Sequence, residues 1–204
     1  MLVMAICLAL SIMGARAQRW TPGRPSLDAL LVFGEGKDFT GVGINGAVVT
    51  WNNYQYLGKT SLGVDFYSHP YGFVLPEVTD KEGMVVAPQE DLVFRGYDVT
   101  LGGGYFVRAL ATRSRTLMLS VGVSLYAGIR YGDDVSAYEK EQGKNYSAVG
   151  FLLNIIPEAQ LEAFPASNVS LFLSARPRLQ VVNTHAGAYD WFRFTWGLGA
   201  KYYF

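Results

Sequence analysis

The sequence predicts an all-β fold: one eight-stranded antiparallel up-and-down transmembrane β-barrel, preceded by a cleaved signal peptide. Three observations support this prediction. In residues 192–204, apolar side chains alternate with polar or small ones, and the segment ends on an aromatic residue. Such alternation is typical of a strand that has one face in lipid. Residues 116–131 keep the same alternation in strict register. Short and long connections alternate along the chain, as they do in outer-membrane barrels.

The amino terminus has the form of an export signal. An apolar run, residues 1–13, precedes the segment GARAQ at residues 14–18, which has the small-x-small pattern of a signal-peptidase site. We expect cleavage after Ala17, so that residues 1–17 are the signal and residues 18–204 form a single domain. A membrane anchor is the alternative, but the run is shorter than the roughly 20 residues that a spanning helix needs. The only cysteine, Cys7, lies in the signal, so the mature chain is expected to lack disulfides and thiolate sites.

The composition excludes several classes of protein. The chain carries 17 basic and 17 acidic side chains, so no basic field is available to hold nucleic acid. Beyond the signal no apolar run is long enough for a membrane helix, because the longest uncharged stretch, residues 39–58, is interrupted by glycines and asparagines. Aromatic residues make up 14% of the chain and glycines number 23. Aromatics anchor barrels at both membrane interfaces, and glycines permit strong sheet curvature.

The first half of the mature chain is predicted to contain strands at residues 26–34, 41–51, 54–67 and 92–106. In the second of these, Ile44 and Val48 are expected on one face. The pair Asn52 and Asn53 is a turn signal and is expected to lead into the third strand. A long polar loop is expected at residues 68–91.

The second half is predicted to contain strands at residues 116–131, 145–164, 169–182 and 192–204, with a charged loop at residues 132–144. Pro157 and Pro177 conflict with this assignment, because proline cannot donate to a β-ladder and a closed barrel has no edge. We expect each either to mark a bulge or to show that the strands are shorter.

Alternation places apolar side chains outside the barrel and charged ones inside. A soluble lipocalin-like barrel has the opposite polarity. An eight-stranded barrel has room only for its own side chains, so the charges are expected to pair with each other and fill the lumen. The predicted lumen ionic cluster consists of Lys59, Asp65, Asp98, Arg130, Arg176, Arg178, Arg193 and Lys201.

No catalytic, cofactor-binding or metal-binding residue is predicted. The two histidines, His69 and His185, fall in or beside expected outer loops, and no G-x-S-x-G nucleophile elbow surrounds them. Asp133 and Asp134 lack the spacing of a calcium loop. The glycine triplet at residues 102–104 leads to more strand rather than to a helix, so tight curvature is favoured over a phosphate-binding loop.

The carboxyl terminus resembles the signal that the outer-membrane barrel-assembly machinery reads, a glycine followed by two aromatics, here Gly199, Tyr202 and Phe204. A polar residue usually stands two positions before that glycine, where this chain has Gly197. The resemblance implies this machinery as a partner during insertion and a location in the bacterial outer membrane. Both termini are then expected in the periplasm.

The order of features resembles the conjugative-transposon TraO family. The resemblance rests on Gln18-Arg19 and Pro22, the segment at residues 94–98 leading to Gly103 and Tyr105, Gly122-x-Ser124 before Gly128 and Tyr131, and the strand to Phe204. The loop at residues 68–91 and the opening of the sixth strand depart from the family's pattern. The resemblance implies a component of the conjugative transfer apparatus with no catalytic residues. Its partners would be outer-membrane lipid and other conjugation proteins, without direct contact with the transferred DNA.

Two other functions remain open. A general outer-membrane barrel for adhesion or envelope integrity would differ from the first hypothesis only in its genetic neighbourhood. A lipid-modifying enzyme at the barrel rim would depend on His69 or His185.

Overall fold

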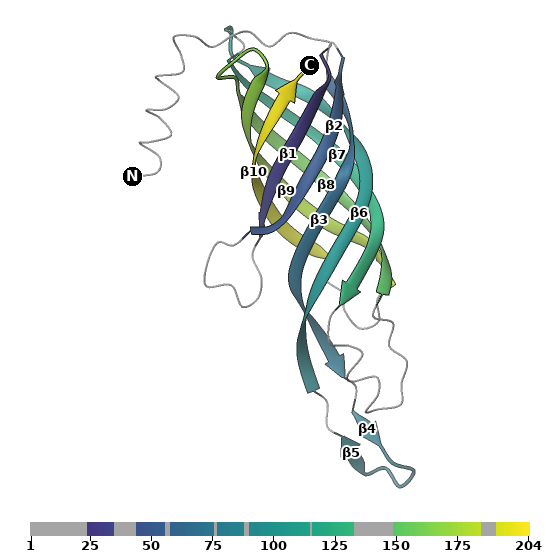
Figure 1. The fold of residues 1–204 in the computed structure, drawn as a ribbon. Helices are drawn as coiled ribbons and strands as arrows, with labels where there is room; N and C mark the ends of the chain where they lie inside the picture. The colour runs from purple at the N-terminus through teal and green to yellow at the C-terminus, as the bar shows by residue number, and fades with distance from the viewer. Residues whose placement is uncertain are drawn as a thin grey trace, which may run out of the picture.

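The computed structural model describes residues 24–34, 44–55, 58–75, 77–87, 90–114, 116–132, 149–184 and 191–204. Eight strands form a closed antiparallel barrel in the order β1-β10-β9-β8-β7-β6-β3-β2, and β4 and β5 form a separate hairpin (Figure 1). The predicted eight-stranded antiparallel barrel is confirmed. The predicted signal peptide lies outside the described residues. The described residues contain no helix long and apolar enough to cross a membrane.

The barrel strands are β1 (Ser26–Gly34), β2 (Ile44–Tyr54), β3 (Gly58–Leu75), β6 (Glu90–Ala111), β7 (Leu117–Gly132), β8 (Val149–Ala163), β9 (Val169–Asn183) and β10 (Phe192–Tyr203), and the hairpin strands are β4 (Val78–Thr79) and β5 (Val85–Ala87). The barrel closes between its first and last strands, with Ser26 opposite Tyr203 and Gly34 opposite Thr195. Beside this seam, Arg24 Nε donates a 2.7 Å hydrogen bond to the terminal oxygen of Phe204.

The two ends of the barrel differ. The connections at residues 55–57, 112–116 and 164–168 are short and lie at the end that carries the carboxyl terminus, here called the short-turn end (Figure 1). At the opposite end, here called the long-loop end, β1, β7 and β9 stop at Gly34, Gly132 and Asn183, and nine, 16 and eight residues separate them in sequence from the next barrel strand. The extended β3–β6 pair also lies at this end (Figure 1). This alternation is the one expected of an outer-membrane barrel.

The wall has apolar side chains outside and polar ones inside, so the barrel is of the transmembrane type. Exposed aliphatic residues occupy the middle of the strands, among them Leu31, Leu101, Val123, Leu125, Leu173 and Leu198. Exposed aromatics lie toward the long-loop end (Phe66, Tyr97, Tyr131, Phe151, Phe194 and Trp196) and toward the short-turn end (Trp51, Tyr105, Tyr202 and Phe204). At a strand tilt of about 40°, Phe194 and Phe204 stand roughly 25 Å apart along the barrel axis, the height of a membrane-facing apolar band.

Two expectations for the second strand are wrong. Ile44 faces outward while Val48 is buried, because a register shift after Val32 makes Asn45 an extra residue of a bulge. Asn52 and Asn53 lie within β2 rather than in a turn. The chain instead turns after Tyr54, where the Gln55 N–H donates a 2.7 Å hydrogen bond to the Gly58 carbonyl.

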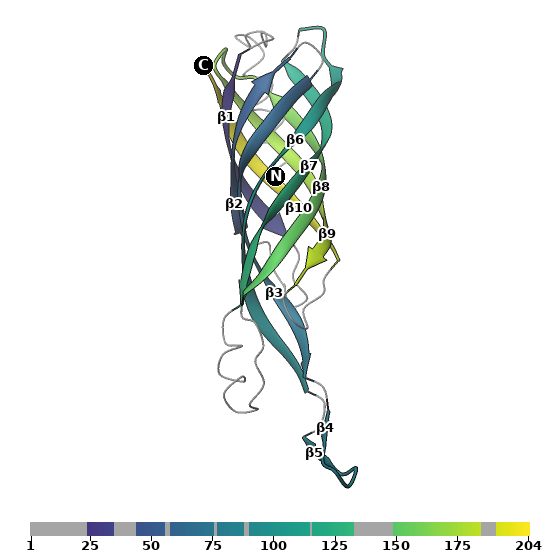
Figure 2. The same cartoon turned by 90° about the vertical axis from the view of Figure 1, so that its right-hand side faces the viewer.

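The long loop expected at residues 68–91 is mostly strand. β3 and β6 stay paired as far as Leu75 opposite Glu90. The pairing of β2 with β3 stops at Tyr67, and that of β7 with β6 stops at Gly96. Beyond these residues β3 and β6 therefore form a two-stranded ribbon that leaves the wall and leads to the β4–β5 hairpin (Figures 1 and 2).

The two prolines lie inside full-length strands, so neither expected effect occurs. The β8–β9 ladder has no residue pairs between Ile155–Leu179 and Ala159–Ala175, and the register is the same on both sides of this gap. Pro157 and Pro177 therefore lie opposite each other, and the two missing N–H groups fall at one place in the ladder. The register shift of this strand pair lies elsewhere, after Leu153.

Glycines on the inner face make room for aromatic rings. A Cβ added at Gly199 would lie 2.5 Å from the ring of Phe172, and one at Gly122 would lie 2.6 Å from the ring of Phe106. Gly102 has a different role, because its Cβ would lie 2.0 Å from the Leu125 carbonyl oxygen. The glycine triplet thus lies inside β6, where neighbouring backbones approach closely.

Candidate functional site: the ionic lumen

Among the residues that the structure describes, the lumen contains five buried acids and five buried bases. The acids are Asp28, Asp65, Asp98, Glu158 and Glu162, and the bases are Lys59, Arg130, Arg176, Arg178 and Lys201. Every residue of the predicted lumen cluster is placed on the inner face, and Arg193 differs from the others only in being half-buried, near the long-loop end. Charges in a narrow interior require partners within hydrogen-bonding distance, and the described residues form three groups of such partners along the barrel.

The first group lies near the short-turn end and is built on two lysines. Lys201 Nζ is 2.9 Å from Glu162 Oε2 and 3.6 Å from Asp28 Oδ2. Lys59 Nζ is 3.7 Å from the same Asp28 oxygen. Gln160 Oε1 accepts from both ammonium groups, at 2.7 Å from Lys59 and 3.0 Å from Lys201. Because Lys59 also lies 4.7 Å from the centre of the Phe106 ring, this lysine is held on several sides.

Glu162 completes that group through two hydroxyl groups. Ser170 and Tyr203 both donate hydrogen bonds to Glu162 Oε1. The Tyr203 hydroxyl also lies 3.1 Å from that of Tyr54. A buried carboxylate with this many donors needs no solvent to stabilise its charge.

The second group lies in the middle of the barrel and is built on two arginines. Arg176 Nε is 3.2 Å from Glu158 Oε2, and its Nη2 is 3.4 Å from Asp65 Oδ2. Arg178 forms its ion pair with the same Asp65 oxygen. The second oxygen of Glu158 accepts 2.6 Å hydrogen bonds from Gln160 and Ser174. Gln160 thereby connects the first group to the second.

The third group lies toward the long-loop end, where Arg130 and Asp98 form a bidentate pair. Arg130 Nε and Nη2 donate to the two Asp98 oxygens at 2.7 and 2.8 Å. These residues lie opposite each other on β6 and β7. Arg178 stacks on the Tyr67 ring, 4.2 Å from its centre. A cavity of about 20 Å³ lies among these side chains, with Arg193 also on its lining.

Sequence reasoning did not include Asp28, Glu158 and Glu162 in the cluster. The sequence did indicate their position, because inward residues recur at every second place along a strand. Asp28 stands two residues after the inward Ser26, and Glu158 stands four residues after the inward Asn154. The bulge or strand end expected at Pro157 accounts for the omission of Glu158 and Glu162, but not for that of Asp28, which lies in β1. What the sequence does not contain is the pairing, since Lys201 on β10 reaches across β9 to Glu162 on β8.

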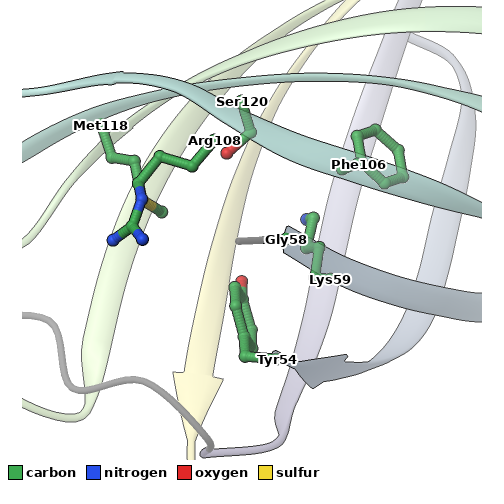
Figure 3. A pocket seen from close by; sticks show the side chains of 7 residues that line it. All are labelled: Tyr54, Gly58, Lys59, Phe106, Arg108, Met118 and Ser120. Carbon is green, nitrogen blue, oxygen red and sulfur yellow. The ribbon is translucent and has the colours of Figure 1, made fainter. Parts of the chain in front are cut away.

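The described lumen is packed. Cavities among its side chains measure about 10 Å³ at the short-turn end and about 20 Å³ in the middle and toward the long-loop end. A water molecule needs roughly 10–15 Å³ by this measure, so each cavity holds about one. Figure 3 shows the cavity at the short-turn end, with Tyr54, Lys59 and Met118 among the side chains around it. The structure thus describes a barrel filled by its own residues rather than an open tube.

Of the two histidines, the structure describes only His69. His69 lies in β3, opposite Gly96 in the ribbon, rather than in a loop. His185, Asp133 and Asp134 lie outside the described residues. Within the described ranges, no group of three or more His, Cys, Asp or Glu side chains is placed to hold a metal ion.

The residues of the predicted assembly signal lie at the short-turn end. Gly199 faces the lumen beneath the Phe172 ring. Tyr202 and Phe204 face outward, with their ring centres 5.2 Å apart in an edge-on contact. Their recognition by the barrel-assembly machinery remains a prediction.

No family model and no curated protein matches the chain. Among solved structures, the chain is similar to Ail, the attachment invasion locus protein of Yersinia pestis, in complex with the heparin analogue sucrose octasulfate. That match has 13% sequence identity and a TM-score of 0.45, and it covers 90% of this chain and 100% of that chain. A second Ail crystal structure matches at 13% identity with a TM-score of 0.38 and the same coverage.

Proposed function

We propose that the chain is a bacterial outer-membrane barrel that acts as a structural or interaction component of the conjugative transfer apparatus. The observation that carries this proposal is the packed ionic lumen. A barrel filled by its own side chains acts through its ends and its outer wall rather than as a passage. That property suits an assembly component, and the resemblance to the TraO family supplies the identity of the assembly.

The proposal includes an orientation and a set of partners. The short-turn end and both termini face the periplasm, as is usual for outer-membrane barrels. The partners are membrane lipid, the barrel-assembly machinery during insertion, and other conjugation proteins. The protein is proposed to be neither an enzyme nor a nucleic-acid binder, and its formal net charge of zero offers no general attraction for DNA.

A deletion in the donor cell tests the proposal. Removal of the gene is expected to lower the transfer frequency sharply, and a wild-type copy is expected to restore it. Cross-linking of mating cells followed by purification of the barrel is expected to recover transfer-channel proteins. Unchanged transfer in the deletion strain would contradict the proposal. As a control, His69→Ala and His185→Ala are expected to leave transfer, lipid A and phospholipids unchanged, whereas altered lipids would favour a rim enzyme.

A second candidate is a general outer-membrane barrel for adhesion or envelope integrity. The β3–β6 ribbon favours it, because the ribbon carries the β4–β5 hairpin away from the barrel wall (Figure 2). In that case the deletion strain would transfer normally but adhere less or become sensitive to detergent. An absence of transfer genes beside this one would also favour it.

A further inference from the structure

The hairpin at the end of the ribbon exposes three consecutive apolar residues to water. Met84, Val85 and Val86 are 69%, 54% and 67% exposed. The hairpin lies beyond the ribbon formed by residues 68–75 of β3 with β6 (Figures 1 and 2). At about 3.3 Å per residue this part of the ribbon is roughly 25 Å long. The three side chains therefore stand outside the lipid band, so lipid does not account for their exposure.

The hairpin holds these residues in a defined geometry. Asp80 Oδ1 accepts hydrogen bonds from the backbone N–H groups of Glu82, at 2.9 Å, and Met84, at 2.8 Å. The Asp80 N–H donates at 2.9 Å to the Met84 carbonyl. Gly83 has a φ of 82°, which favours glycine. A turn that is already ordered loses little conformational entropy when it binds.

The charges around the apolar residues select the kind of partner. Glu77, Asp80 and Glu82 are exposed, and Lys81 is the one base between residues 77 and 87, so the tip carries an acidic excess. This excess repels an anionic membrane surface and a second copy of the same tip. It attracts a protein surface that is rich in Lys or Arg.

We propose that this apolar tip, Met84 to Val86 with its acidic rim, docks onto a protein whose apolar patch is bordered by Lys or Arg side chains. The inference rests on the proposed function for the identity of the assembly, and it names the surface through which the barrel contacts its partner. Exposed apolar groups enter the partner's patch, while Glu77 and Glu82 pair with basic groups at its border. Apolar contact at the centre with charges at the rim is the usual arrangement of a protein interface.

Binding to cells tests this docking surface. The protein, labelled with a fluorophore in phosphatidylcholine nanodiscs, is added to intact cells of the host bacterium before and after their surface proteins are removed by protease. Wild type is expected to bind untreated cells and to lose this binding after protease. Val85→Ser/Val86→Ser is expected to bind at least about tenfold more weakly. Glu77→Lys/Glu82→Lys is also expected to bind more weakly and to lose the sensitivity of binding to salt.

Several results would overturn the inference. They are an absence of protease-sensitive binding, wild-type affinity of Val85→Ser/Val86→Ser, equal binding to phosphatidylglycerol vesicles, or dimers of the wild type in analytical ultracentrifugation. The matched control Lys81→Gln should bind at least as tightly as wild type, and retention of the compact, heat-modifiable form in electrophoresis checks that every variant is folded.

The transfer assay separates this inference from the proposed function. Normal transfer by the deletion strain, together with lost cell binding by Val85→Ser/Val86→Ser, would remove the conjugation role and leave the docking surface. Lost transfer in the deletion strain, together with full binding and transfer by the double variant, would do the reverse.

Discussion

Asp65→Asn tests whether the ionic lumen holds the barrel together. Asp65 is 0% exposed and is the shared partner of Arg176 and Arg178. When the charge of Asp65 is removed, Arg176 still has an ion-pair partner, because its Nε lies 3.2 Å from Glu158 Oε2. Arg178 has no second carboxylate among its described ion pairs, so the loss falls mainly on this arginine. Breaking a buried pair costs about 3–5 kcal/mol.

The Tyr67 ring reduces this loss. It lies 4.2 Å from the Arg178 guanidinium and continues to stabilise the cation by about 1 kcal/mol. We therefore expect Asp65→Asn to lower the free energy of unfolding by about 3 kcal/mol. The assay is urea unfolding in phosphatidylcholine vesicles, followed by tryptophan fluorescence, because Trp51 and Trp196 lie on the outer face and leave the lipid on unfolding.

A double-mutant cycle with Arg178→Gln isolates the pair. The double variant is expected to lose about 2 kcal/mol less than the sum of the two single variants, because it leaves no unpaired charge at this site. The exposed control Glu77→Gln is expected to change the unfolding free energy by less than about 0.5 kcal/mol. The reasoning is refuted if Asp65→Asn unfolds like that control or if the cycle shows no coupling.

Three further predictions follow from the wall, the lumen and the inner glycines. Leu125→Arg places a charge on the lipid face near the middle of β7 and is expected to lower the free energy of unfolding by about 2–4 kcal/mol in the same assay. A change near zero would argue against lipid contact at this residue. The protein in planar bilayers is expected to give no steady single-channel current, because the described lumen cavities each hold about one water molecule. A stable conductance would contradict the packed interior. Gly199→Ala forces a methyl group against the Phe172 ring and is expected to lower the free energy of unfolding by about 1–3 kcal/mol. Ala200→Gly, on the outer face, is the control, and equal stability of Gly199→Ala and wild type would argue against close packing at the ring.

The architecture was predictable because alternation acts on each strand separately. The inward and outward faces of β7 and β10 follow from residue order alone, since one side of the wall contacts lipid and the other contacts the lumen. The ribbon was missed for the same reason. Once β3 and β6 leave the wall, neither face contacts lipid, so the sequence there lacks the apolar alternation that marks a membrane strand.

Residue types that usually mark turns or strand ends gave wrong predictions where they lie inside barrel strands. Asn52 belongs to a dipeptide typical of turns, yet it lies fully buried in β2, near the Ser26 and Thr50 hydroxyl groups. The opposed prolines of β8 and β9 could be located only once the register was known. The lysines and arginines of the lumen followed from alternation, but their carboxylate partners depend on contacts across the barrel, which no property of a single strand specifies.

The central claim is that the wall has lipid outside and its own polar side chains inside, and spin labelling along β7 tests it most directly. Single cysteines replace residues 119–125 in turn, in a Cys7→Ser background, and each labelled protein is inserted into vesicles. Collisions of the label with oxygen, which concentrates in lipid, are expected to be frequent at 119, 121, 123 and 125 and rare at 120, 122 and 124. Equal oxygen access at neighbouring positions, or a monomer that stays in solution without lipid or detergent, would contradict the account.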